Sequence, residues 1–132
     1  MDKLLKFIAI PAILVTILNP GCAQVSKERK LIVGTWLSEE KSRQLDFKAN
    51  GECFELYTGS KISNTYNYRV SDIMPDCIPK ESIDPKEKVT FLEMINKKSG
   101  MKLCYEINGF TATTLSLRKL GSGGYILLYR KE

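Results

Sequence analysis

The stretch RQLDFKANGECFELYT, residues 43–58, decides which fold the sequence predicts. Apolar Leu45 and Phe47 occupy alternate positions, which is the period of a β-strand with one buried face. An Asn-Gly pair at 50–51 follows, and this dipeptide is the strongest short signal of a tight hairpin turn. Apolar and polar residues then alternate again after the turn. The stretch therefore predicts two antiparallel strands joined by a turn.

The second strand of this hairpin also predicts which side chains point inward. Apolar Phe54 and Leu56 alternate with Cys53 and Glu55. Because a strand presents successive side chains to opposite faces, we expect the apolar pair to face the core. Cys53 and Glu55 are then expected on the outer face.

Strand-like segments continue on both sides of this hairpin. A second Asn-Gly pair at 108–109 predicts another hairpin turn, and the alternation slips between Ala112 and Leu115, as it does at a β-bulge. Residues 71–88 contain three prolines and no period, which predicts one long loop. The predicted strands cover residues 31–37, 43–49, 52–58, 64–70, 89–96, 101–107, 110–119 and 125–131.

Eight short strands joined mostly by tight turns predict an all-β fold. No helical pattern of useful length appears from residue 22 onward. A meander of eight antiparallel strands protects its edges best by closing into an up-and-down barrel. A barrel of this size is either filled by its own side chains or holds one small ligand.

The chain begins with a segment typical of an export signal. Lys3 and Lys6 precede the apolar run FIAIPAILVTIL, residues 7–18, and small residues follow it. The run is shorter than the roughly 20 residues that a membrane-spanning helix needs, and Pro11 interrupts it. Residues 1–21 are therefore predicted to be a secretory signal peptide.

The residues after this run offer two processing sites. LNPGC, residues 18–22, resembles a bacterial lipobox, in which Gly directly precedes a Cys that receives a diacylglyceryl group. This resemblance favours lipidation of Cys22, with residues 22–30 as a short tether. It predicts a lipid-anchored protein of the cell envelope, on the periplasmic or surface face of the outer membrane. The alternative is cleavage after Ala23, which would release a soluble periplasmic protein.

The composition argues against several kinds of site. The net charge is +5, but basic and acidic residues alternate along the chain, which is typical of a solvated surface and not of a nucleic-acid-binding protein. There is no histidine and no C-x-x-C pair, so neither a zinc site nor a Ser-His-Asp triad is expected. No glycine-rich phosphate loop is present. The sequence predicts no enzyme, no cofactor and no metal.

Three cysteines, Cys53, Cys77 and Cys104, lie in the part predicted to be exported, where oxidising conditions favour a disulfide. The preferred pair is Cys53 with Cys77, because the long loop is expected to leave from the barrel end at which Cys53 lies. Cys104 then remains free. Pairing of Cys77 with Cys104 is the alternative.

Three short motifs resemble those of the lipocalins and the wider calycin superfamily, and more closely those of small lipocalin-like lipoproteins of Gram-negative envelopes. They are GTW at 34–36, F-x-x-N-G at 47–51 and YRK at 129–131. The resemblance covers residues 31–132 and implies a single barrel domain. It also implies that Trp36 seals one barrel end, with Arg130 packed against its indole ring.

Four side chains are candidates for contact with a ligand inside the barrel. Tyrosine rings can contact an apolar ligand while their hydroxyls orient it, and the alternative is that the rings are core filling. Glu93 lies inside only if its face of the strand, and not the face of Leu92 and Met94, points inward. The candidates are Tyr66, Tyr68, Glu93 and Tyr105.

These patterns predict a non-catalytic exported lipoprotein whose lipocalin-like barrel binds a small, mostly apolar ligand in or at its mouth. The alternative is an envelope protein–protein interaction module whose barrel is filled. A cavity lined by the tyrosines favours the first function, and a filled barrel with an exposed apolar patch favours the second.

Overall fold

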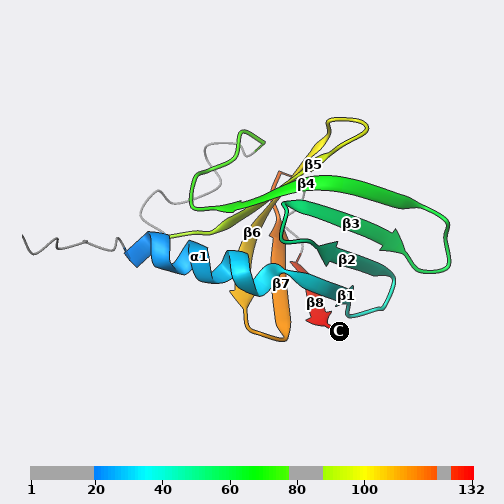
Figure 1. Cartoon of the computed structure of the whole chain (residues 1–132), viewed down its shortest axis with the longest axis horizontal. Coiled ribbons are helices and arrows are strands. Elements are labelled where there is room, and N and C mark those ends of the chain that lie inside the picture. Colours follow the sequence, from blue (N-terminus) through cyan, green and yellow to red (C-terminus); the bar gives the residue numbers. More distant parts are fainter. Residues whose placement is uncertain (1–19, 78–87, 122–125) are drawn as a thin grey trace, which may run out of the picture.

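The computed structural model of the chain describes residues 20–77, 88–121 and 126–132 (Figure 1). One helix, α1 (Pro20–Ile32), precedes eight strands. The predicted signal peptide, residues 1–21, lies outside the described residues except for its last two positions. The strands are β1 (Gly34–Ser38), β2 (Arg43–Phe47), β3 (Glu52–Tyr57), β4 (Ser63–Ser71), β5 (Phe91–Asn96), β6 (Lys102–Phe110), β7 (Thr114–Lys119) and β8 (Ile126–Lys131).

The eight strands close into an antiparallel up-and-down barrel, as the alternation predicted. Each strand pairs with the next in sequence, and β1 also pairs with β8. Trp36 of β1 therefore lies opposite both Leu45 of β2 and Lys131 of β8. Closing the sheet in this way pairs its two edge strands with each other. The predicted fold class is confirmed, and the barrel is compatible with a lipocalin-like fold.

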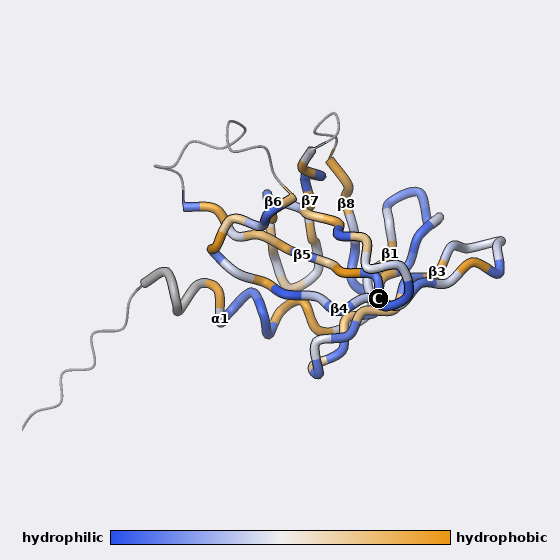
Figure 2. Tube along the Cα trace, turned by 90° about the horizontal axis from the view of Figure 1, so that it is seen from above, coloured by the Kyte–Doolittle hydropathy of each residue, from blue (hydrophilic) through white to orange (hydrophobic). Residues whose placement is uncertain are grey.

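The two ends of the barrel differ in what covers them. α1 meets the end at which β1 begins and β8 finishes, which we call the helix end (Figure 1). The opposite, far end carries the β1–β2, β3–β4 and β5–β6 turns. Figure 2 shows α1 extending away from the barrel, with much of its length hydrophilic. The described chain therefore enters the barrel from one side, through α1.

Large side chains fill the barrel interior. Every strand contributes at least one of them, and α1 contributes Ile32. Each such apolar side chain stabilises the fold by roughly 1.5–3 kcal/mol when it is removed from water. The interior cluster comprises Ile32, Trp36, Leu45, Phe47, Cys53, Tyr66, Val70, Leu92, Met94, Tyr105, Leu115, Leu117 and Tyr129.

β3 presents the opposite face from the one that its hydrophobicity predicted. Cys53 and Glu55 are 0% and 1% exposed, whereas Phe54 and Leu56 are 39% and 47% exposed. The reason is the hairpin register, which places Cys53 directly opposite Phe47. Paired residues point to the same side of a sheet, and Phe47 belongs to the core, so Cys53 and Glu55 must point inward as well.

The second Asn-Gly pair forms a β-bulge and not the predicted turn. β6 runs through Asn108 and Gly109 as far as Phe110, and its register with β7 shifts between Ile107 and Gly109. The extra residue lets Phe110 point inward, where its ring meets that of Trp36 edge-on with centroids 5.8 Å apart. The turn itself lies at 111–113, where Thr111 N donates to Thr114 O at 2.9 Å.

α1 corrects the expectation of an irregular tether over residues 22–30. These residues are helical, and the helix continues to the barrel wall. Val25 and Ile32 are buried, and most residues between them are polar. Two apolar residues seven positions apart lie on one side of a helix, but so sparse a pattern gives little signal in a sequence. The prediction of no helix from residue 22 onward is wrong.

The disulfide joins Cys77 to Cys104, so the preferred pairing of Cys53 with Cys77 is wrong and the alternative is confirmed. The two Cα atoms are 6.4 Å apart, within the normal range. Cys53 points into the interior, whereas the loop that carries Cys77 runs over the outside of the barrel. There Cys77 joins an outer cluster with Phe91, Cys104 and Leu120.

Candidate binding site

A buried ion pair occupies the half of the interior nearer the far end. Arg43, the first residue of β2, and Glu55 of β3 both point inward. Arg43 Nε donates to Glu55 Oε2 at 2.5 Å, and Arg43 Nη2 contacts the same oxygen. A guanidinium matches a carboxylate in both charge and geometry, which lets this pair remain charged away from water.

Three polar side chains from two other strands, β4 and β8, complete the cluster. Tyr66 Oη and Asn64 Nδ2 donate to Glu55 Oε1 at 3.1 Å and 2.9 Å. Arg43 Nη1 donates to Tyr129 Oη at 2.9 Å. Burial and the charge of Glu55 raise the pKa of Tyr66, so its hydroxyl stays protonated and remains a donor.

The polar groups of this cluster bond to one another, which leaves fewer of them for a ligand inside the barrel. Both oxygens of Glu55 accept hydrogen bonds from the protein, and Arg43 donates through three of its nitrogens. Breaking such a pair away from water is costly unless the ligand replaces every bond. The arrangement therefore acts as an internal brace that joins β2, β3, β4 and β8.

Trp36 closes the helix end, but its cationic partner is not the predicted Arg130. Lys131 Nζ lies 5.2 Å from the Trp36 ring centroid and donates to Leu31 O at 3.2 Å. Trp36 Nε1 donates to Ile32 O at 2.8 Å. Arg130 is exposed, because neighbouring residues of a strand point to opposite faces and Lys131 occupies the inward position. The cation beside Trp36 is thus Lys131, one residue after the predicted Arg130.

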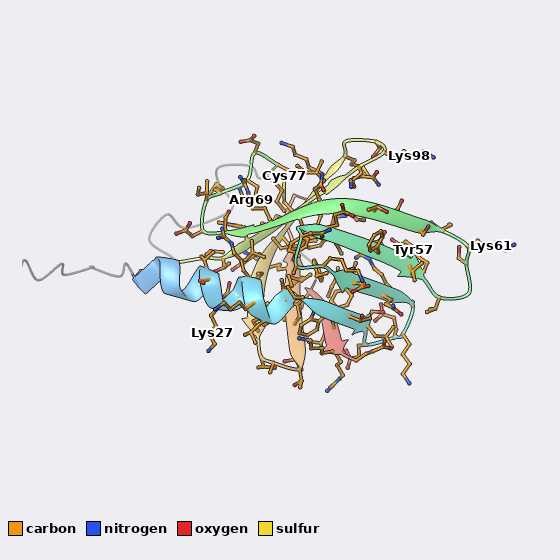
Figure 3. All side chains as sticks on the ribbon, viewed as in Figure 1. Lys27, Tyr57, Lys61, Arg69, Cys77 and Lys98 are labelled. Atoms are coloured by element: carbon orange, nitrogen blue, oxygen red, sulfur yellow. A yellow bond between two sulfur atoms is a disulfide. The ribbon has the colours of Figure 1, made fainter. Side chains whose placement is uncertain are left out.

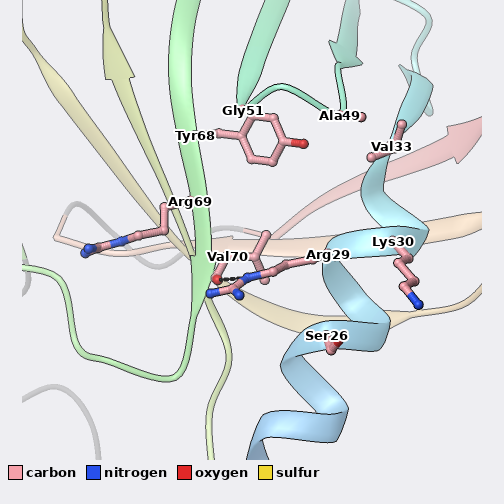
Figure 4. Close-up of a pocket in the computed structure, with 9 residues that line it drawn as sticks. All are labelled: Ser26, Arg29, Lys30, Val33, Ala49, Gly51, Tyr68, Arg69 and Val70. Carbon is pink, nitrogen blue, oxygen red and sulfur yellow. Dashed lines mark hydrogen bonds between the residues drawn. The ribbon is translucent and has the colours of Figure 1, made fainter.

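A pocket of about 430 Å³ lies at the helix end of the barrel, between α1 and β4, and we call it the helix groove (Figure 4). α1 forms one wall, β4 the other, and the β2–β3 turn closes one side. Its volume falls within the lower part of the range for small-molecule sites. The groove is lined by Ser26, Arg29, Lys30, Val33, Ala49, Gly51, Tyr68, Arg69 and Val70.

Arg29 bridges the two walls of the groove. Its Nε donates to Val70 O at 2.9 Å, so a helix side chain is tied to the backbone of β4. Figure 4 shows its guanidinium lying between α1 and β4, with Lys30 and Arg69 at the two rims and pointing away. Tyr68 Oη donates to Lys48 O at 2.6 Å, which fixes its ring on the groove side of β4. The groove thus combines a held cation with apolar surface.

A second pocket, of about 330 Å³, lies near the far end between β4 and the β5–β6 turn. Its lining is polar, and one of its lysines, Lys97, already pairs with Glu52 at 3.1 Å. Asn96 Oδ1 accepts from the backbone N–H groups of Lys98 and Ser99, which shapes the turn. The pocket offers little apolar contact for a ligand of the predicted kind.

The four predicted ligand-contacting residues do not converge on one site. Tyr66 and Tyr105 are buried in the filled interior, which is their core-filling alternative. Tyr68 packs against the edge of the same interior cluster, with its ring 4.9 Å from that of Phe47, and lines the helix groove. Glu93 lies on the outer face of β5, 3.8 Å from Arg69, while its neighbours Leu92 and Met94 point inward. The interior carboxylate is Glu55.

Sequence reasoning missed both Glu55 and Arg29, for different reasons. The signal for Glu55 was available: a tight turn at 50–51 pairs Phe47 with Cys53, and this register carries Glu55 inward. Arg29 had no such signal, because it depends on α1 docking beside β4, and nothing in a polar segment shows where a helix docks.

Among the described residues, no group of three His, Cys, Asp or Glu side chains is close enough to hold a metal ion. Within the same ranges, no helix has the length and hydropathy to cross a membrane. Comparisons with protein-family models, curated proteins and solved structures found no match to this chain.

Proposed function

We propose that this protein is a non-catalytic exported lipoprotein, anchored in the cell envelope through Cys22, that binds a small, mostly apolar molecule. The ligand occupies the helix groove and not the interior of the barrel. The observation that carries this proposal is the contrast between the two places. Buried side chains and the Arg43–Glu55 cluster occupy positions inside the barrel, whereas the groove is a pocket of about 430 Å³.

The cysteines support export. Disulfides persist in oxidising compartments and are rare in the cytosol. Cys77 and Cys104 are bonded across the outer surface of the barrel, and Cys53 is buried in the core. Apart from Cys22, each cysteine is thus either disulfide-bonded or buried in the core. This leaves Cys22, next to the apolar N-terminal run, as the residue suited to lipidation.

The walls of the groove support the ligand class. Val33 contributes an apolar side chain, Tyr68 contributes an aromatic ring, and Ala49 leaves space at the turn, with the buried Val70 behind them. Pockets for small molecules are mostly apolar and have a few polar groups that fix the orientation of the ligand. Arg29 and Ser26 are such groups here.

Titration with a neutral apolar fluorophore tests this function. Released protein carrying Cys22→Ala, which needs no detergent, is expected to bind the fluorophore saturably. Ala49→Trp should abolish binding by filling the groove, because Ala49 is exposed in its lining. Ala112→Trp is the matched control, since Ala112 is an exposed alanine of the β6–β7 turn. Binding that survives Ala49→Trp, or no saturable binding at all, would exclude the groove as the site.

A second candidate function, a protein-interaction module, rests on apolar residues outside the barrel. Phe54 and Leu56 project from the outer face of β3, and Ile62 of the β3–β4 turn is 60% exposed. An exposed apolar patch beside a filled core is typical of a protein-binding surface. Cross-linking in intact envelopes separates the two candidates: Leu56→Lys should remove a protein partner if this surface is the functional one, and should leave fluorophore binding unchanged.

A further inference from the structure

We propose that the helix groove holds the phosphate of an anionic phospholipid, taken from the same membrane in which Cys22 is anchored. The phosphate binds to Arg29, and the adjoining glycerol and acyl segments lie against the apolar wall. This inference rests on the proposed function, because it names the ligand class of the same groove.

The first argument is the way Arg29 is held. Its Nε donates to Val70 O at 2.9 Å, which fixes the plane of the guanidinium between α1 and β4 (Figure 4). Arginine presents its donors as a rigid fork that fits phosphate oxygens, and a fork already fixed loses less freedom when it binds. The residue is also exposed, so a head group can reach it.

The second argument is the charge around Arg29. Lys27, Arg29 and Lys30 stand on α1 against one carboxylate, Glu28, so this stretch of the helix carries a net charge of +2. Lys27 and Lys30 are exposed, whereas Arg69 on the opposite rim points away and lies 3.8 Å from Glu93. Basic side chains next to an anionic membrane surface each add favourable binding energy.

The third argument is the distance to the anchor. Cys22 and Arg29 belong to the same helix, seven residues apart, which is about 10 Å along the helix axis. The helix is tied to the barrel at its other end, because Trp36 Nε1 bonds Ile32 O and Lys131 Nζ bonds Leu31 O. An acylated Cys22 therefore keeps Arg29 near the head groups of the membrane.

The apolar wall completes the site. Val33 at the end of α1 and Val70 and Tyr68 on β4 lie beside Arg29 in the lining of the groove. A free phosphate ion has no apolar atoms to contact this wall, whereas a phospholipid covers it with glycerol and the first part of an acyl chain. The shared chemistry of both ligands is the phosphate group, so the test must distinguish the two sources.

Photo-cross-linking in nanodiscs tests the proposal with the acylated protein. Equal traces of photoreactive phosphatidylglycerol or phosphatidylcholine, with identical acyl chains, are placed in discs of phosphatidylcholine. Labelled peptides of α1 and β4 are quantified by mass spectrometry. We expect about fivefold more labelling by the anionic lipid, the preference that one basic residue near an anionic head group supplies.

Three variants and one competitor make the result specific. Arg29→Gln should lower the preference to what Lys27 and Lys30 supply, and Arg29→Lys should recover only part of the loss, because lysine keeps the charge but not the fork. Lys61→Gln is the matched loss of charge, since Figure 3 shows Lys61 on the opposite side of the molecule from Lys27. It should leave the preference intact, as should millimolar inorganic phosphate.

Equal labelling by the two lipids, or an unchanged preference in Arg29→Gln, would overturn the proposal. So would loss of labelling in inorganic phosphate, which would identify a site for the free ion. If the neutral fluorophore still binds the groove in these cases, the proposed function stands and only the phospholipid assignment fails. If the fluorophore fails as well, both fail.

Discussion

Arg43 and Glu55 form a buried ion pair inside the barrel, joined by a 2.5 Å hydrogen bond from Arg43 Nε to Glu55 Oε2. Glu55 is almost fully enclosed, and Tyr66 and Asn64 bind its other oxygen. A polar cluster of this kind fixes the positions of β2, β3 and β4 relative to one another. It also places a buried charge pair in the half of the interior nearer the far end, whereas the helix groove lies at the helix end.

Glu55→Gln should lower the free energy of unfolding by about 3 kcal/mol, because the charge of Arg43 is then left without its partner away from water. Chemical denaturation measures this change. The double variant Arg43→Met with Glu55→Leu should recover more than half of the loss, since it removes both charges and keeps the volume. Arg43→Met and Glu55→Leu are also measured alone, and strict additivity of these two substitutions would contradict the buried pairing.

The cation that closes the helix end can be identified by comparing two neighbouring residues. Lys131→Met should destabilise the barrel by about 1 kcal/mol, because it removes the contact with the Trp36 ring and the hydrogen bond to Leu31 O. Arg130→Met should change stability by less than about 0.5 kcal/mol, as expected of an exposed side chain. Thermal unfolding measures both losses of stability. A larger loss in Arg130→Met than in Lys131→Met would identify Arg130 as the residue that packs on Trp36.

Whether a feature could be predicted from the sequence depends on whether neighbouring residues or distant contacts determine it. Strand positions and barrel closure depend on local alternation and turn residues, so all eight strands were predicted. The errors at Cys53, Glu55 and Arg130 each concern which face a residue occupies, and a shift of one position reverses the face. The Asn-Gly pair at 108–109 failed because Phe110 is needed in the core beyond it.

The candidate site was less predictable than the fold. The sequence pointed to tyrosines inside the barrel, and their placement depends on how tightly the other side chains fill that space. The groove depends on α1, whose docking rests on Val25, Ile32 and the bond from Arg29 to Val70 O. Long-range contacts of this kind leave no periodic trace in the chain.

The thiol of Cys53 should not react with alkylating reagents in the folded protein. Burial raises the pKa of its thiol to about 12, so almost no thiolate forms at neutral or mildly alkaline pH. Iodoacetamide at pH 8 is expected to leave Cys53 unmodified until the protein is unfolded. Because the thiol ionises near its ordinary pKa once unfolded, Cys53 stabilises the fold below about pH 9, and this contribution falls as the pH rises toward 12. Rapid alkylation of native protein would contradict its burial.

Lipidation of Cys22 is tested in cells with a fatty-acid analogue. The protein should incorporate the label and remain with the membrane fraction, because two acyl chains hold a protein more firmly than one. Cys22→Ala should lose the label and appear in the soluble fraction. Equal labelling of both forms would rule out Cys22 as the acylation site.

Photolabelling with a neutral apolar probe that carries a diazirine tests the central claim most directly, namely that the ligand binds in the helix groove and not deeper in the barrel. The Cys22→Ala protein is labelled, digested and mapped by mass spectrometry. We predict that the modified residues lie in α1 and β4, at Val33 and Tyr68 of the helix groove, and that Ala49→Trp suppresses them. Modification of Tyr105 or Leu117, which lie in the interior cluster, would contradict this account and place the ligand inside the barrel.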